Sequence, residues 1–152
     1  MSGRLAGIAR HAVRRGPIET IDAVMLSVDR GVEGDVRGVR KPDGRNRRQV
    51  SLMEASDWTA ATAAIGIDLP WSTRRANLLV DGLDLPQIAG ARIRIGADAV
   101  LEITVECDPC VRMDEIAMGL QEALRPDWRG GACARVIEEG RIAVGDEIRI
   151  ET

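Results

Sequence analysis

The apolar residues of this chain fall into many short runs, which are separated by turns containing glycine and proline. The clearest pair, residues 91–95 and 99–106, alternates in polarity on either side of Gly96-Ala97-Asp98, which is typical of a β-hairpin. Similar patterns predict further strands at residues 3–13, 18–28, 50–53, 78–81, 132–139 and 146–152. Many short strands with glycine-rich turns favour a closed barrel, so we predict a mainly β fold with short helices.

Two segments have helical periodicity instead. Residues 54–65 place apolar side chains on one face, and Gly66 can end that helix. Residues 112–124 do the same with a stripe of Met113, Ile116, Ala117, Leu120 and Leu124. Between the strands, residues 31–49 form a long glycine-rich loop. Loops of this length in compact domains are usually functional or disordered.

The length of 152 residues predicts one domain, residues 1–152, with enough core to fold without a covalent staple. Its core must be aliphatic, because the chain has no Phe or Tyr and only three Trp. No apolar run approaches the roughly 18 residues that span a membrane. The N-terminus lacks the ordered regions of a signal peptide, so we expect a cytoplasmic protein without membrane contact.

Two of the three cysteines, Cys107 and Cys110, form a C-x-x-C motif between a predicted strand and a predicted helix, and Cys133 is the third. A helix N-terminus and Arg112 favour a thiolate, but four nearby carboxylates oppose it. Three interpretations of these cysteines compete: they are small core residues, they form a dithiol redox pair, or they ligate zinc. Zinc is disfavoured, because it needs about four ligands and only Cys133 and His11 could complete the set. Redox chemistry on a thioredoxin-like fold is disfavoured because the chain lacks an alternating βαβ pattern.

The net charge of −3 gives no general attraction to nucleic acid, and no aromatic residues lie among the basic ones to stack on bases. Basic residues nevertheless crowd into one segment and one following pair: Arg37, Arg40, Lys41, Arg45, Arg47, Arg48, then Arg74 and Arg75. A local basic patch suits a small anion, although a solvated basic loop has the same composition. Lys41 is the only lysine and lies in this loop, so intrinsic pyridoxal phosphate is not expected.

Five segments, taken in order, resemble the MOSC domain family, the C-terminal domain of molybdenum-cofactor sulfurases. They are GVEGDVRG (31–38), RRQVSLME (47–54), RRANLLVDGLDL (74–85), the hairpin with its C-x-x-C (93–110) and RGGACARVIEEGRIAVGD (129–146). The resemblance implies a MOSC-type β-barrel of pyruvate-kinase-barrel-like topology. It also places Cys110 where the family has its characteristic cysteine. Arg37 lies near a position where many members carry His.

For function, the resemblance implies two kinds of chemistry at Cys110. In some relatives this thiolate ligates the molybdenum of a bound pterin cofactor, molybdopterin, and the enzyme reduces N-hydroxylated compounds. In sulfurase relatives the cysteine carries sulfur. The chain has no flavin or iron–sulfur motif, so reduction would need an electron-donor protein, and sulfur would need a separate cysteine desulfurase. A non-enzymatic binding module with structural cysteines is the third alternative.

Other candidate residues follow from the anionic tail of such a cofactor. Arginine forks suit phosphate, which makes Arg47, Arg48, Arg74 and Arg75 the candidate ligands. Asn77 is a candidate contact to the pterin edge. The remaining candidates are Asp35, Gly130 and Gly131. The backbone N–H groups of the two glycines could approach an oxyanion. Simple turn geometry explains all three residues equally well.

Overall fold

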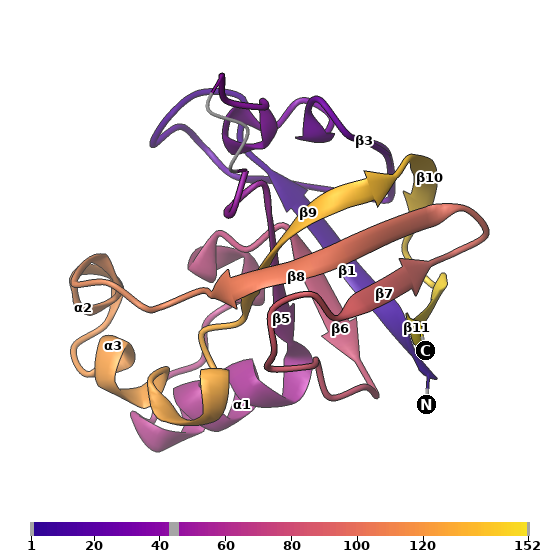
Figure 1. Ribbon diagram of the computed structural model, residues 1–152. Coiled ribbons are helices and arrows are strands. Elements are labelled where there is room, and N and C mark those ends of the chain that lie inside the picture. Colours follow the sequence, from indigo (N-terminus) through magenta and orange to yellow (C-terminus); the bar gives the residue numbers. More distant parts are fainter. Residues whose placement is uncertain (1, 43–45, 152) are drawn as a thin grey trace.

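Seven strands close into a barrel within residues 2–42 and 46–151, which the computed structural model describes (Figure 1). Around the ring they are β1 (Ser2–Arg10), β11 (Glu147–Glu151), β7 (Arg92–Ile95), β8 (Ala99–Glu106), β9 (Ala132–Glu138), β5 (Val50–Glu54) and β6 (Leu78–Asp81). Strand β1 pairs with both β6 and β11, and this double pairing closes the ring. The predicted fold class, a mainly β barrel with short helices, is confirmed.

Strands β5 and β6 are the one parallel pair in this ring, and the other neighbours are antiparallel. A closed ring with an odd number of strands must contain such a pair. Parallel neighbours need a long crossover connection. Here residues 55–77 provide it, with helix α1 (Ala55–Ala64) and the 3-10 turn η2 (Trp71–Arg74). This connection carries Arg74 and Arg75 to the end of the barrel where the cleft described below lies.

The barrel strands alternate between two apolar cores. Leu52, Leu78 and Val80 point into the barrel and belong to its fully aliphatic centre. Met53 and Leu79 point outward and pack beneath the helices, in a second cluster with Trp58 and Leu120. This is the two-residue period expected of strands that are buried on both faces. Figure 1 shows the helices gathered together at one side of the barrel.

Two predicted segments are divided. Residues 18–28 split at Asp22 into β2 (Glu19–Ile21), which pairs with β1, and β3 (Ala23–Ser27). Strand β3 leaves the barrel and forms a small second sheet with β10 (Gly140–Ala143) and β4 (Gly31–Val32). The predicted loop 31–49 therefore begins with a strand, followed by the 3-10 turn η1 (Val36–Gly38). Residues 43–45 lie outside the described part of the chain.

The predicted helix 112–124 is wrong as one continuous element. It consists of α2 (Arg112–Ile116) and α3 (Leu120–Ala123), followed by the 3-10 turn η3 (Pro126–Trp128). Ala117 is extended and Gly119 has φ +90°, a conformation that favours glycine. The Asp114 carboxylate accepts the N–H groups of Gly119 and Gln121 and so begins the second helix. No helix in the described residues is long and apolar enough to cross a membrane.

Glu54, at the end of β5, should make the free energy of unfolding depend on pH. Burial, then the nearby Asp57 and Asp84 carboxylates, raises the pKa of Glu54 from 4.5 to about 7, although the Leu85 N–H opposes this. A raised pKa in the folded state means that folding favours the protonated form. The free energy of unfolding therefore falls as pH rises from the ordinary carboxyl pKa through about 7.

We expect Glu54→Gln to remove this penalty while its amide oxygen still accepts the Leu85 N–H. The side chain is only about half buried, so the expected gain in the free energy of unfolding is about 1 kcal/mol at pH 8 and about zero at pH 4. Urea unfolding at both pH values measures it. Glu122→Gln, at an exposed carboxylate, is the matched control and should show no such difference. An equal gain at both pH values would contradict the explanation.

Candidate functional site

Two adjoining hollows lie where the chain after β1, the segment after β4 and the C-x-x-C loop meet. The larger, with a volume of about 790 Å³, is called here the basic hollow. The smaller, of about 300 Å³, contains two cysteines and is called the thiol hollow. The same five residues line both hollows, which therefore form one cleft: His11, Arg15, Arg37, Arg75 and Arg112.

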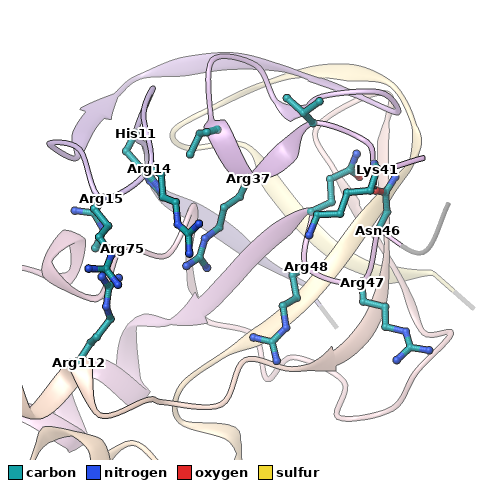
Figure 2. Close-up of a pocket in the computed structure, with 13 residues that line it drawn as sticks. His11, Arg14, Arg15, Arg37, Lys41, Asn46, Arg47, Arg48, Arg75 and Arg112 are labelled. Carbon is teal, nitrogen blue, oxygen red and sulfur yellow. The ribbon is translucent and has the colours of Figure 1, made fainter. Parts of the chain in front are cut away.

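Eight cationic side chains and no carboxylate of the described residues line the basic hollow. They are Arg14, Arg15, Arg37, Lys41, Arg47, Arg48, Arg75 and Arg112. Within residues 2–42 and 46–151, none of the eight forms an ion pair with a carboxylate. Figure 2 shows them on both sides of the opening, with Arg15, Arg75 and Arg112 on one side and Lys41, Arg47 and Arg48 on the other. Cations gathered from distant parts of an acidic chain create a strong local attraction for anions.

The two adjacent arginines of the second basic pair point in different directions. Arg75 has φ +68°, so the chain turns sharply after η2. Its guanidinium donates to the Gly16 carbonyl at 2.7 Å and lies between the two hollows. Arg74 is buried, and its Nη2 donates to the carbonyls of Cys107 and Gly130, at 3.0 Å each. Arg74 thus ties the Cys107 loop, which lines the thiol hollow, to the loop of Gly130. Its Nε has no hydrogen-bond partner among the described residues.

Cys107 and Cys110 both line the thiol hollow but differ in exposure. Cys110, the predicted working thiol, is exposed, whereas Cys107 is only 9% exposed. The pKa of the Cys107 thiol is lowered to about 6, chiefly by a hydrogen bond from the Cys133 thiol and then by nearby Arg74, while burial opposes the shift. Arg74 Nη2 lies 3.5 Å from the Cys107 sulfur. Cys133 is buried and its own pKa is raised by the same contact, so Cys107 is the thiolate of that pair.

His11 also lines the cleft, although the sequence did not indicate this, because a lone His at the end of a strand is usually structural. It follows β1 directly, and its backbone N–H donates to Asp35 Oδ1 at 3.0 Å. Its Nδ1 is 3.4 Å from the same oxygen without forming a hydrogen bond. Burial, followed by Arg75 and Arg37, lowers the pKa of His11 against the opposing effect of Asp35. The imidazole is therefore neutral near pH 7 and offers the cleft an uncharged polar group.

Four predicted site residues lie outside the cleft walls. Asp35 is buried under His11, and its carboxylate also accepts the Arg37 N–H at the start of η1. Asn77 bridges two barrel strands, accepting the Ser51 N–H and donating to the Ala9 carbonyl. These contacts use the polar atoms of both side chains within the fold.

Gly130 and Gly131 were predicted to direct their N–H groups at an oxyanion, but both N–H groups donate to backbone carbonyls instead. The N–H of Gly130 donates to the Leu124 carbonyl at 3.0 Å, and that of Gly131 donates to the Trp128 carbonyl at 2.9 Å. Both N–H groups therefore form hydrogen bonds within local turns of the chain. The predicted Arg47, Arg48, Arg74, Arg75 and Cys110 do line the cleft. Arg45 lies outside the described residues.

Comparison with known proteins agrees with this architecture. No curated protein sequence matches the chain. The YuaD protein from Bacillus subtilis superposes with a TM-score of 0.82 at 21% identity, over 97% of this chain and 94% of YuaD. YiiM from Escherichia coli superposes with a TM-score of 0.71 at 15% identity, over 98% of this chain and 70% of YiiM. YiiM from Geobacillus stearothermophilus gives 0.67 at 14% identity, over 99% and 73%. These likenesses show the fold, and the model of the MOSC domain matches residues 39–149. The chain therefore belongs to the MOSC domain family.

Proposed function

We propose that this chain binds a phosphate-bearing molybdenum cofactor, with the phosphate in the basic hollow and the Cys110 thiolate as the protein's ligand to the metal. The observation that carries the proposal is the junction of two hollows: one lined by cations that form no ion pair with a described carboxylate, the other containing an exposed thiol. Guanidinium forks suit phosphate, and a soft thiolate suits a thiophilic metal. Membership of the MOSC family supports the same assignment.

The protein's own donor set fits a cofactor better than a bare metal ion. In the described residues, no group of three or more His, Cys, Asp or Glu side chains could hold a metal ion. A pterin dithiolene brings sulfur ligands of its own, so a single thiolate from the protein is a sufficient addition. The cofactor, when bound, would supply two-electron chemistry at molybdenum. The described residues would bind its anionic end and orient it through Arg75, Arg112 and the neutral His11 at the junction.

A role in reducing N-hydroxylated compounds extends this proposal. The thiol hollow, of about 300 Å³, is bordered by Met113 and Ile116 as well as polar groups, so its lining suits a small, partly apolar substrate. Electrons would come from a separate donor protein, because the chain has no flavin or iron–sulfur motif.

Molybdenum and pterin content after expression in a cofactor-replete host tests the proposal. We expect both in the wild type and a loss of metal of at least about tenfold in Cys110→Ala, because the protein's ligand is gone. Cys133→Ala is the matched control: it removes a buried thiol that lines neither hollow, and should retain the metal. Wild-type protein without molybdenum or pterin would refute the proposal.

A sulfur carrier is the second candidate, and one observation favours it. The thiol hollow contains a second cysteine, Cys107, whose pKa is lowered to about 6, and a metal site with one thiolate ligand does not require it. In this function Cys110 would receive a persulfide sulfur from a separate cysteine desulfurase. In Cys107→Ser, the intact mass after incubation with a desulfurase and cysteine would show one added sulfur atom, and peptide mapping would place it on Cys110.

A further inference from the structure

We propose that Cys107 is a resolving thiol: it attacks a persulfide carried on Cys110, forms a Cys107–Cys110 disulfide and releases hydrosulfide. This step rests on the second candidate function, in which Cys110 carries sulfur. It assigns an activity to Cys107, which the resemblance to the family leaves without a role.

The positions of the two thiols support these roles, with Cys110 as the sulfur acceptor and Cys107 as the resolving thiol. They are separated by Asp108 and Pro109, line the same hollow of about 300 Å³, and lie at different depths. Cys110 is exposed and open to an incoming sulfur donor. Cys107, 9% exposed, is shielded from large reagents but is part of the same hollow wall.

The surroundings of Cys107 stabilise it as a nucleophile at neutral pH. Arg74, itself 9% exposed, places Nη2 at 3.5 Å from the Cys107 sulfur. Its Nε is buried and has no hydrogen-bond partner within residues 2–42 and 46–151, which leaves a donor available to an anion formed in this hollow. The Cys133 thiol donates to Cys107 and remains protonated, so it supports the thiolate without competing as an attacking group. Arg48 and Arg37 add further positive charge, which also lowers the pKa of Cys107.

The chemistry balances without an outside oxidant beyond the sulfur donor. A low-molecular-weight persulfide transfers its sulfane sulfur to the Cys110 thiolate and leaves as a thiolate. The Cys107 thiolate then attacks Cys110 Sγ, the Sγ–Sγ bond forms, and the bond from Cys110 Sγ to the outer sulfur breaks. The outer sulfur leaves as hydrosulfide with the bonding electron pair and its own proton. Sulfane sulfur is thereby reduced and the two thiols are oxidised, and a dithiol reductant must restore them. The basic cleft attracts the anionic donor.

Glutathione persulfide is the probe for this step, added under anaerobic conditions to the reduced full chain at pH 7. In the wild type we expect one equivalent of hydrosulfide, loss of the mass of two hydrogens, and a peptide that links Cys107 to Cys110. In Cys107→Ser we expect the mass of one extra sulfur on Cys110 and at least about a tenfold loss of hydrosulfide release. Cys107→Ala is a second variant in case serine disturbs folding, and thermal unfolding checks both.

Cys133→Ala is the matched control. It should still form the Cys107–Cys110 link, with its rate profile shifted to higher pH because Cys107 loses the hydrogen bond that most lowers its pKa. A stable Cys110 persulfide in the wild type, or a link between Cys107 and Cys133, would overturn the resolving role while leaving the carrier function standing. No added sulfur on Cys110 in any variant would refute both together.

Discussion

Gly131→Ala is expected to lower the free energy of unfolding by about 4 kcal/mol, a large fraction of the stability of an ordinary domain. Gly131 has φ +105°, which costs an L residue about 1–3 kcal/mol. A Cβ there would also collide with the backbone carbonyl of Leu52 on β5, which cannot rotate away. Separating β5 from the start of β9 adds a strain of about 1–3 kcal/mol. The Gly131 carbonyl accepts the Cys107 N–H at 2.8 Å, so the thiol loop would shift as well.

Gly145→Ala is the matched control for this prediction. Gly145 has a similar φ of +99°, but a Cβ there meets no atom within 4 Å. It should therefore show only the conformational cost, about 1–3 kcal/mol. Urea unfolding of both variants separates the backbone strain from the collision. Equal losses in the two variants would show that the approach of Leu52 to Gly131 has no energetic consequence.

The barrel could be predicted from the sequence because its strands carry a local signal. The alternation in residues 91–95 and 99–106 predicts a hairpin, and β7 pairs with β8 there. The division at Asp22 could not be predicted in this way, because its cause is a long-range pairing of β3 with β10. The break between α2 and α3 was missed for a related reason. The apolar stripe correctly indicates that Met113, Ala117 and Leu120 are buried. It gives no information on backbone conformation, so it could not reveal that Ala117 is extended.

The cleft was predicted in part. Local charge density pointed to Arg47 and Arg48, which line the basic hollow. Arg14, Arg15 and Arg112 could not be recognised, because each lies far from that segment in the chain and only the fold brings them together. The lowered pKa of Cys107 could not be predicted for a similar reason, because it depends on Cys133 and Arg74, two residues from other elements. Single-residue chemistry is readable from a sequence, whereas the electrostatic effect of distant neighbours is not.

The double variant Arg37→Gln with Arg112→Gln is expected to weaken the binding of inorganic pyrophosphate by about 100-fold, which corresponds to roughly 2.7 kcal/mol. Both arginines line both hollows, and in the described residues neither forms an ion pair whose loss would disturb the fold. Charge-assisted hydrogen bonds to an anion contribute about 1.5–3 kcal/mol each, so two lost contacts are enough for a loss of this size, and water that replaces them offsets the rest. Isothermal titration calorimetry at fixed ionic strength measures it.

The control must separate direct contact from net charge. Arg141→Gln with Arg149→Gln removes the same two charges from residues that line neither hollow. At physiological salt, charges beyond about 8 Å are largely screened, so this variant should change affinity by less than about threefold. An equal loss in both double variants would mean that pyrophosphate senses only the overall charge, and the basic hollow would then not be a binding site. A loss confined to Arg37 and Arg112 would locate the anion at the junction of the hollows, beside the thiols, where a phosphate-bearing cofactor ligated by Cys110 would have to lie.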